Sequence, residues 1–226
     1  MKSDNIIIAV DGPAASGKGT LSRRVANFYG LAYLDTGSLY RGVGWVMLSK
    51  GLSPRDVEDA EVTAKAFTLE QLDGADIRTP DVGRAASVVA ALPEVRDALL
   101  EFQRSFAANP PNGLKGAVLD GRDIGTVVCP DATVKLFIDA AVEVRAERRW
   151  KELNERDSSV SYEQVLEDIK RRDKRDSTRE AAPMKAAQDA HLIDTSMLDI
   201  DASFTAVRRE IDKALMKSAM EGQPTA

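Results

Sequence analysis

The chain has 226 residues, 43% of them hydrophobic and 30% charged, a size and balance that suit one α/β domain with an ordinary core. Its formal net charge of -5 argues against a nucleic-acid polymer as partner, whereas a local group of arginines and lysines can still hold a small phosphorylated ligand. The single cysteine, Cys129, excludes an intramolecular disulfide and a cysteine-rich zinc site. No apolar stretch approaches the roughly 18 residues that span a bilayer. We therefore expect a monomeric, cytoplasmic protein without a membrane partner.

Short apolar runs alternate with helical patterns along the chain. In chain order, the patterns predict strand 6–10, helix 21–28, strand 31–34, helices 39–48, 54–67, 82–91 and 93–106, strands 117–119 and 134–138, helices 142–153 and 162–175, strand 191–193 and helix 204–216. This alternation predicts a five-stranded parallel sheet with helices on both faces. In such sheets ligands bind at the carboxyl ends of strands, so the polar residues that follow the strands are the candidates for a site.

The first strand ends in a glycine-rich loop that leads into a helix. The loop consists of Gly12, Pro13, Ala14, Ala15, Ser16, Gly17, Lys18, Gly19 and Thr20. In this context the backbone N–H groups curl around a phosphate, and the helix N-terminus adds its positive end. Lys18 can reach the β- and γ-phosphates of ATP. Gly19 stands where the strict pattern has Ser or Thr, which makes direct Mg²⁺ ligation by Thr20 less expected.

Two further strand ends carry polar motifs. Residues 34–41, LDTGSLYR, offer Thr36 as the N-cap of the next helix, Asp35 toward the phosphate loop and Arg41 about one and a half turns later. An ordinary cap with a surface arginine is the alternative reading of this motif. Residues 118–126, VLDGRDIGT, place two carboxylates around an arginine, with glycines that permit a close backbone approach. A solvated turn rarely needs that arrangement.

In these motifs the chain resembles the bacterial cytidylate kinases, which belong to the P-loop nucleoside-monophosphate kinases. The resemblance covers nearly the whole chain: GPAASGKGT, LDTGSLYR, the helix pair that contains residues 85–96, LDGRDIGT and the arginine-rich run 170–179. Shikimate, adenylate and dephospho-CoA kinases share the loop but do not resemble the other motifs. The resemblance implies a P-loop kinase fold and transfer of the γ-phosphoryl group of ATP to CMP, and to dCMP as well, giving ADP and CDP or dCDP.

The resemblance also implies roles for individual residues. The implied catalytic residues are Lys18, Asp35, Arg122, Arg172 and Arg179. Thr36, Arg41, Arg122 and Arg172 would hold the acceptor phosphate, Ser87, Arg96 and Asp123 would read cytosine, Asp176 would bind the ribose, and Arg179 would lie near the reacting phosphates. Mg²⁺ would be held mainly through ATP and water, with Thr20 and Asp35 as candidate ligands. A guanidinium suits phosphate oxygens or O2 and N3 of cytosine, and a carboxylate can accept from its N4 amine.

We expect one kinase domain over residues 1–226, with an acceptor-binding lobe at roughly 51–110 and a helical lid at roughly 150–162. Longer bacterial relatives carry an antiparallel, β-rich insert before Ile77. Here the segment 65–76 is short and shows no hairpin of alternating residues. The acceptor lobe is therefore expected to be reduced, which affects its closure and affinity rather than the chemistry.

Basic residues concentrate in two late helices of this acidic chain. Arg145, Arg148 and Arg149 have the spacing of one helix face, and Arg172, Arg175 and Arg179 repeat it. Crowded like charges favour a polyphosphate as their partner. The alternative is a solvated face on which nearby carboxylates neutralise the arginines. The only histidine, His191, is expected to be buried or to cap an element rather than to act in catalysis, and Cys129 to be a packed thiol rather than a nucleophile.

Two other functions remain open on the sequence. The acceptor could be another small molecule, such as UMP, AMP or a non-nucleotide. From a different class, the chain could be a switch protein that signals by ATP occupancy with slow turnover. Of these two, only the kinase of another small molecule would show turnover that depends on an acceptor.

Overall fold

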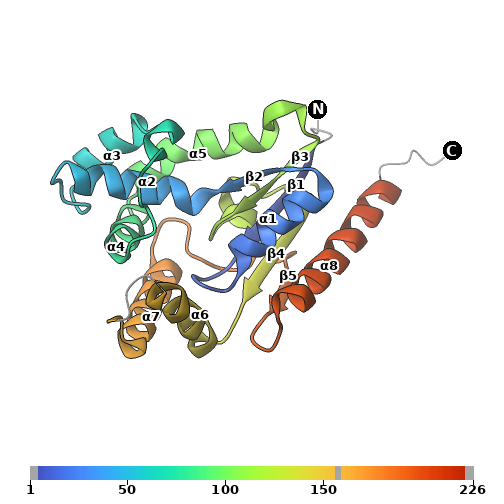
Figure 1. The fold of residues 1–226 in the computed structure, drawn as a ribbon. Helices are drawn as coiled ribbons and strands as arrows, with labels where there is room; N and C mark the ends of the chain where they lie inside the picture. Colours follow the sequence, from blue (N-terminus) through green and yellow to red (C-terminus); the bar gives the residue numbers. More distant parts are fainter. Residues whose placement is uncertain (1–4, 156–158, 222–226) are drawn as a thin grey trace.

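A five-stranded sheet forms the centre of the structure, a computed structural model that describes residues 5–155 and 159–221 (Figure 1). Its strands are β1 (Ile6–Asp11), β2 (Ala32–Asp35), β3 (Gly116–Asp120), β4 (Val134–Asp139) and β5 (His191–Asp194). The order across the sheet is β2-β3-β1-β4-β5, and each neighbouring pair is parallel. The predicted α/β fold with a five-stranded parallel sheet is confirmed.

Helices connect the strands and cover the sheet. They are α1 (Lys18–Tyr29), α2 (Thr36–Ser49), α3 (Val57–Lys65), α4 (Pro80–Val89), α5 (Pro93–Ala108), α6 (Val142–Asn154), α7 (Tyr162–Thr178) and α8 (Ile200–Glu221), with the short helical turns η1 (Leu69–Leu72), η2 (Pro111–Gly113) and η3 (Ile124–Val128). No helix among the described residues is long and apolar enough to cross a membrane.

Side chains that alternate along β1 supply two cores, one on each face of the sheet. Ile8 and Val10 pack in one cluster with Val25 of α1 and Ile211 of α8. Ala9, between them, belongs to a second cluster to which α5 and η3 contribute. Because successive strand residues point to opposite faces, β1 is buried on both sides, as its continuous apolar run predicts.

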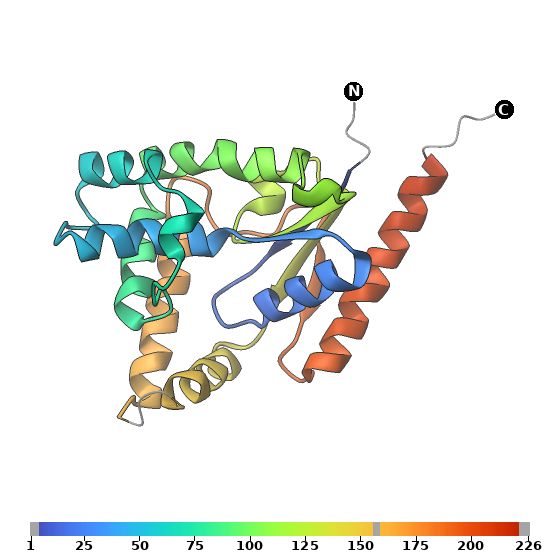
Figure 2. The ribbon, with the colours of Figure 1, turned by 45° about the horizontal axis from the view of Figure 1, so that its top comes forward.

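The helices between β2 and β3 gather at one end of the sheet, away from α8 (Figure 2). They share a separate core that includes Leu39, Val43, Met47, Val89 and Leu99. Helices α2 and α4 approach closely at Gly44, where an added Cβ would lie 3.0 Å from the Cβ of Ala85. This contact fixes the distance between two helices that carry candidate site residues, Arg41 and Ser87.

Helices α6 and α7, between β4 and β5, pack on each other around Ala146, Val165 and Ile169. In both ribbon views they stand below the group formed by α2 to α5 and beside the phosphate loop, whose Ala15 packs against them (Figures 1 and 2). The carboxyl ends of the strands therefore face three surroundings: the phosphate loop, the group of α2 to α5, and the pair of α6 and α7.

Most elements match their predicted positions, with differences at the ends. The helix predicted at 54–67 is shorter, because Asp56 caps α3 by accepting a hydrogen bond from the N–H of Asp59. Helix α8 begins at Ile200, four residues earlier than predicted. The segment 65–76 contains η1 and no strand, in line with the expected lack of a hairpin. Part of the predicted lid, 156–158, lies outside the described residues.

Candidate active site

The phosphate loop leaves β1 at Gly12 and enters α1 at Lys18. Gly12 has φ 146°, and an added Cβ would lie 2.0 Å from the carbonyl oxygen of Ile138, so no other residue fits there. Ala15 and Gly17 also have positive φ, 60° and 86°. When residues with positive and negative φ alternate along the backbone, their N–H groups point toward one concave side, which creates a cradle for an anion. The observed backbone agrees with the predicted phosphate loop.

One hydroxyl group in the loop is buried without a partner. Ser16 is 1% exposed, and its Oγ has no hydrogen-bond partner among the residues that the structure describes. A buried hydroxyl without a partner is costly, so this position suits a ligand oxygen. Thr20, by contrast, is exposed on the first turn of α1.

Lys18 lies at the carboxyl ends of the strands, the edge of the sheet on which the site is built, beside two aspartates. Its Nζ is 3.6 Å from an Oδ of Asp120 and 3.5 Å from the carbonyl oxygen of Pro13. Burial, with a smaller contribution from Arg122, lowers the pKa of Lys18 to about 8, although Asp120 and Asp35 act to raise it. Asp35 and Asp120 end neighbouring strands and stand opposite each other in the register of β2 and β3. The structure thus brings Lys18 and Asp35 to one edge of the sheet, as predicted, and adds Asp120.

A small cavity of about 50 Å³ lies beside this edge, between α2, α4, α5, α7 and the turn after β3. It gathers eight of the predicted residues: Thr36, Ser87, Arg96, Arg122, Asp123, Arg172, Asp176 and Arg179. These residues come from five separate segments of the chain, so their convergence is a property of the fold rather than of local sequence. Tyr40 also lines this cavity, which the motif analysis did not assign to the site.

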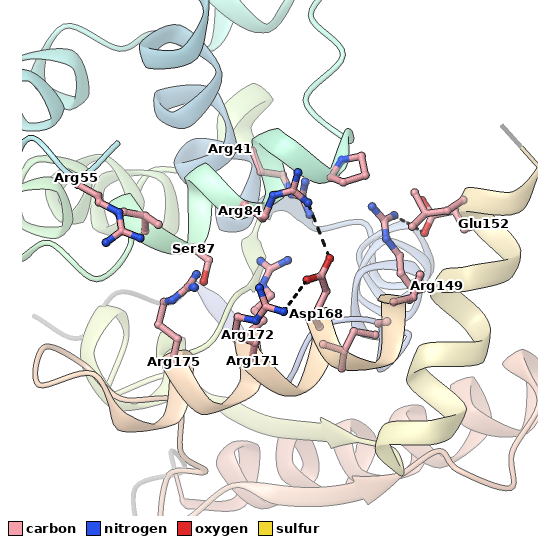
Figure 3. Close-up of a pocket in the computed structure, with 18 residues that line it drawn as sticks. Arg41, Arg55, Arg84, Ser87, Arg149, Glu152, Asp168, Arg171, Arg172 and Arg175 are labelled. Atoms are coloured by element: carbon pink, nitrogen blue, oxygen red, sulfur yellow. Dashed lines mark ion pairs between the residues drawn. The ribbon is translucent and has the colours of Figure 1, made fainter. Parts of the chain in front are cut away.

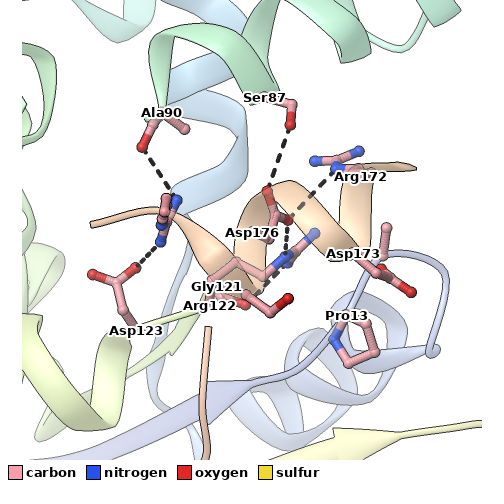
Figure 4. Close-up of polar contacts among 12 residues, drawn as sticks. Pro13, Ser87, Ala90, Gly121, Arg122, Asp123, Arg172, Asp173 and Asp176 are labelled. Carbon is pink, nitrogen blue, oxygen red and sulfur yellow. Dashed lines mark hydrogen bonds and ion pairs between the residues drawn. The ribbon is translucent and has the colours of Figure 1, made fainter. Parts of the chain in front are cut away.

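Ion pairs line the cavity, and Asp123 is the centre of one group; Figure 4 shows its pairing with one guanidinium. Arg96 pairs with one carboxylate oxygen of Asp123, and Arg179 Nη2 lies 3.3 Å from the other. Both arginines also donate to the carbonyl oxygen of Ala90, at 3.2 Å. Burial raises the pKa of Asp123, and Arg96 and Arg179 oppose that shift. All three charged side chains are less than a tenth exposed.

Asp176 is the centre of the other group (Figure 4). Its Oδ2 is 3.1 Å from Nε of Arg122 and 3.8 Å from Nε of Arg172, and its Oδ1 accepts from Ser87 Oγ at 3.5 Å. Burial acts to raise the pKa of Asp176, but the neighbouring arginines, Arg122 first, hold it below its usual value. Asp176 therefore stays a carboxylate and fixes two guanidinium groups at the mouth of the cavity.

A larger cavity of about 520 Å³ adjoins the small one and reaches the phosphate loop (Figure 3). Its wall includes Ala14 and Ala15 of the loop, and it shares Ser87 and Arg172 with the small cavity. Seven arginines line it: Arg41, Arg55, Arg84, Arg149, Arg171, Arg172 and Arg175. Glu152 and Asp168 are the acidic residues in this lining, so the cavity is strongly cationic and suits a polyphosphate.

Arg41 and Arg172 project toward the larger cavity with few strong partners. Arg41 Nη1 donates to the carbonyl oxygen of Ile77 at 2.9 Å. Arg172 Nε has no hydrogen-bond partner among the described residues. Burial, with a smaller contribution from Arg122, lowers the pKa of Arg172 to about 9. Both side chains are thus held where an anion would relieve the desolvation and repulsion of their charges.

The three arginines of α6 do not share one environment. Arg149 lines the larger cavity and pairs with Glu152 at 2.8 Å. Arg145 is buried and pairs with Asp173 at 2.7 Å. Arg148 donates to the main chain of Thr195 at 2.7 Å. The prediction of one common polyphosphate face is wrong, because Arg149 lines the larger cavity whereas Arg145 and Arg148 are not among its lining residues. For Arg145 the alternative holds in part, since Asp173 neutralises it, but the pair is buried rather than solvated.

The family-model comparison decides the family. A model described as cytidylate kinase matches residues 8–213, which includes the phosphate loop, both cavities and α7.

The chain belongs to the cytidylate kinase family.

Curated cytidylate kinases are similar along nearly their full length. The chain is 56% identical over 200 residues to the cytidylate kinase of Paramagnetospirillum magneticum, covering 88% of this chain and 94% of that relative. It is 56% identical over 209 residues to the cytidylate kinase of Azorhizobium caulinodans, covering 92% of this chain and 99% of that relative. Family membership agrees with the resemblance stated from the sequence motifs.

A solved structure supports the fold alone. An uncharacterized protein from Eubacterium ventriosum superposes with a TM-score of 0.51 at 16% sequence identity, covering 92% of this chain and 99% of that chain. At this identity the likeness concerns the arrangement of strands and helices.

Within this member of the cytidylate kinase family, two local predictions need correction. Asp35, not Thr36, is the N-cap of α2, because its Oδ1 accepts from the N–H of Ser38 at 3.2 Å. Thr36 instead donates its hydroxyl hydrogen to the carbonyl oxygen of Asp120 at 2.8 Å. His191 is half-buried rather than buried, with Nδ1 3.5 Å from Glu210. The packed state of Cys129 is confirmed, and burial raises the pKa of its thiol to about 11.

Asp11 and Asp120 are buried carboxylates that motif reading did not assign. Asp11 accepts hydrogen bonds from the N–H groups of Ile124 and Gly125, both at 2.8 Å, and burial raises its pKa to about 7. It therefore holds the turn that carries Asp123 in place. Both carboxylates come directly at the end of a buried strand, and this position in a parallel sheet was the signal that could have identified them.

Proposed function

We propose that this chain transfers the γ-phosphoryl group of ATP to CMP, giving ADP and CDP, and that dCMP serves as an acceptor as well. The observation that carries the proposal is the junction of the two cavities. A phosphate loop opens into the cationic cavity, and that cavity shares Ser87 and Arg172 with a second cavity whose polar groups match cytosine. The family membership and the names of its curated relatives support the same acceptor.

In this proposal the phosphate loop holds the donor. The N–H groups of the loop and Lys18 bind the β- and γ-phosphates of ATP. The orphaned hydroxyl of Ser16 offers a further contact to a phosphate oxygen or a metal-bound water. Family membership implies ATP as the co-substrate.

Mg²⁺ fits this site as an ion held mainly by ATP and water. No group of three or more His, Cys, Asp or Glu side chains within residues 5–155 and 159–221 could enclose a metal ion. Asp35 and Asp120 do lie at the edge beside Lys18, and one or two carboxylates with substrate phosphates are what Mg²⁺ commonly uses. When bound, Mg²⁺ neutralises charge on the phosphates. We propose Asp35 and Asp120 for that ion and not Thr20, which is exposed.

The acceptor phosphate is proposed to lie where the two cavities meet. Arg122 and Arg172, oriented by Asp176, would bind its oxygens together with Arg41 from the larger cavity. Thr36 also lines the small cavity, but its hydroxyl group already donates its hydrogen to the carbonyl oxygen of Asp120. Thr36 would therefore bind the acceptor phosphate through its backbone. No general base is needed, because a nucleotide phosphate oxygen is anionic at pH 7. Catalysis would come from alignment and from the surrounding cations.

Cytosine is proposed to enter between Arg96 and Asp123. The guanidinium donates to O2 and N3, the carboxylate accepts from N4, and these two groups already form a complementary donor–acceptor pair. Arg179, which was predicted near the reacting phosphates, here binds Asp123. To serve the phosphates it must release Asp123 when cytosine binds. For Asp176 to bind the ribose, as predicted, its carboxylate must accept from a ribose hydroxyl while it remains paired with Arg122 and Arg172.

Two segments are proposed to close over the substrates. The acceptor lobe at 51–110 would approach the phosphate loop, and the lid at 150–162, which follows the arginines of α6, would cover ATP. Closure would exclude water and limit hydrolysis of ATP.

The test is a coupled assay of ADP formation with CMP, dCMP, UMP, AMP and no acceptor. We expect acceptor-dependent turnover with CMP and dCMP, and a Lys18→Ala variant that stays folded but turns over about 10²–10³ times more slowly. A preference for another acceptor would refute the cytosine assignment. A rate of ADP formation that no acceptor changes would favour the switch protein. A near-normal rate in folded Lys18→Ala would refute the phosphate-loop assignment.

A further inference from the structure

Arg148 lies on the outer side of the phosphate loop, opposite the concave side that receives phosphates. Its Nη2 donates to the carbonyl oxygen of Thr195 at 2.7 Å, and its Nη1 lies 3.2 Å from Thr195 Oγ1 and 3.4 Å from the carbonyl oxygen of Ser16. The guanidinium thus binds the loop and the end of β5 together. None of the steps proposed above uses this side chain.

Thr195 completes the contact from the other side. It is 1% exposed, and its Oγ1 lies 3.1 Å from the carbonyl oxygen of Ser16 and 3.0 Å from that of Asp139. Its N–H also donates to the carbonyl oxygen of Asp139 at 2.9 Å. Thr195 is therefore anchored to the end of β4, and the Ser16 carbonyl lies within reach of two donor groups, the Arg148 guanidinium and the Thr195 hydroxyl, whose single hydrogen can go to Ser16 or to Asp139.

The geometry of a peptide unit transmits this contact to the inside of the loop. A trans peptide is planar, so the C=O of Ser16 and the N–H of Gly17 point in opposite directions. Holding the carbonyl oxygen on the outer side directs the Gly17 N–H to the concave side. Among the described residues no acceptor binds that N–H. A donor on the carbonyl also polarises the peptide and strengthens its N–H as a donor.

We propose that Arg148 and Thr195 are positioning residues that orient the Gly17 N–H toward the phosphates of the donor nucleotide. The proposal rests on the function proposed above and deepens it, because it assigns the orientation of the phosphate loop to a helix that also carries Arg149 of the cationic cavity. Arg148 acts through the loop and does not contact the substrate. The geometry of its fork, rather than its charge alone, is what the role requires.

The test compares matched variants by calorimetric binding of MgADP and of CMP. Arg148→Met removes the fork, and Arg148→Lys keeps the charge but replaces the planar fork with a single ammonium group. Thr195→Val removes the hydroxyl, and Thr195→Ser restores it. Arg209→Met, which deletes an arginine that is 69% exposed on α8, is the control.

We expect Arg148→Met and Arg148→Lys to bind MgADP roughly tenfold more weakly, the size of one lost charge-assisted hydrogen bond, with CMP binding unchanged. Thr195→Val should weaken MgADP binding, and Thr195→Ser should restore it. The amide resonance of Gly17 in ¹H–¹⁵N spectra should move in the ligand-free Arg148 and Thr195→Val variants and not in Arg209→Met.

Three outcomes would overturn the proposal: parent-like MgADP binding by folded Arg148→Met, rescue by Arg148→Lys, or an unchanged Gly17 resonance. If Arg148→Met does not fold, parent-like binding by Thr195→Val decides against it in the same way. A parent chain that binds no MgADP would instead refute the proposed function, so the two failures are distinct.

Discussion

At the scale of single residues, Lys18 has an ammonium group that the fold makes easy to deprotonate. Its pKa of about 8 is lowered mainly by burial, and the neighbouring Asp120 only partly offsets that loss. The pKa of the free enzyme appears in kcat/KM. We therefore expect kcat/KM for ATP to be level below pH 8 and to fall about tenfold per pH unit above it.

The control for this pH profile is Lys18→Arg, whose guanidinium stays charged and should remove the fall near pH 8. For the free energy of unfolding, the expected pH dependence has the opposite sign to that of kcat/KM. The unfolded lysine, with its ordinary pKa of 10.5, binds more protons than the folded one between pH 8 and 10.5. The free energy of unfolding should therefore rise with pH in this window, relative to a Lys18→Met variant. A profile that is unchanged in Lys18→Arg would contradict the assignment.

Asp123 gives the sharpest prediction on base choice. Asp123→Asn supplies an amide that can donate to O4 of uracil, whereas the carboxylate can only accept. A site built for a substrate NH rejects the analogue that lacks it by roughly 10⁴. We expect the parent to prefer CMP strongly, and Asp123→Asn to narrow the ratio of kcat/KM for CMP over UMP while weakening the use of CMP.

The same substitution has a structural consequence that the sequence did not suggest. Asp123 neutralises two buried guanidinium groups, those of Arg96 and Arg179. Removing one partner of a buried ion pair costs about 3–5 kcal/mol, so Asp123→Asn should also unfold at lower urea concentration. An unchanged CMP-to-UMP ratio in a folded variant would show that Asp123 does not read the base.

What the sequence could and could not provide differs from residue to residue. The phosphate loop was predictable because its residues are contiguous and their spacing has a physical cause. The pairing of Asp123 with Arg96 and Arg179 was not, because the three residues come from different elements and meet only through tertiary packing. The cap of α2 was misplaced by one residue since Asp and Thr are both good caps, and only the backbone decides between them.

At the scale of elements, α7 and α8 both carry arginines, in different settings. Arg172 faces the cationic cavity and Arg179 pairs with buried Asp123, whereas Arg208 and Arg209 pair with carboxylates on the exposed face of α8. We expect Arg172→Ala and Arg179→Ala to lower kcat/KM by at least tenfold, and Arg208→Ala or Arg209→Ala to change it less than twofold, as about 1 kcal/mol or less is expected for an exposed pair. Steady-state kinetics with CMP would measure this, and equal small effects at all four positions would refute the role of α7.

The close packing of α2 on α4 gives a second prediction at this scale. Gly44→Val would place side-chain atoms against Ala85 and the main chain of Ala86, which start at 3.0 Å from an added Cβ. Overpacking of this kind costs about 1–3 kcal/mol. Because α2 carries Arg41 and α4 carries Ser87, we expect KM for CMP to rise more than KM for ATP.

The control for that variant is Leu48→Ala on the same helix, where the side chain is 38% exposed and lies outside the core that α2 and α4 share. It should leave both KM values near those of the parent. Equal rises in the two KM values of Gly44→Val would indicate general destabilisation rather than a shift of the acceptor site.

The order of strands and helices along the chain was largely predictable, because apolar residues recur with different periods in strands and in helices. The ends of the helices were not predictable. Helix α3 is shorter than predicted because Asp56 caps it at its start, three residues into the predicted range, and because the apolar residues Ala66 and Phe67 lie beyond its last residue, Lys65. The strand order β2-β3-β1-β4-β5 was beyond the reach of the sequence patterns, because periodicity describes each element separately and says nothing about which strands become neighbours.

At the scale of the whole molecule, we expect a monomer in solution. The net charge of -5 makes copies repel each other, and both faces of the sheet are covered by helices. Light scattering after size exclusion should give one species near 24.5 kDa at low salt and at physiological salt. A stable species of twice that mass would contradict the prediction.

The neighbouring positions of β2 and β3 have a consequence for how such a protein can change during evolution. Asp35 and Asp120 stand side by side in the sheet, and the chain between them leaves the sheet after Asp35 and re-enters it at Gly116, the start of β3. Residues can be inserted into that excursion or deleted from it without moving any strand, since loop length adds little to the entropic cost of closing it. The excursion is thus a module that selection can lengthen, shorten or exchange for a different acceptor while the phosphate loop stays as it is. A chimera that carries the excursion of a longer relative would be the natural way to study that independence.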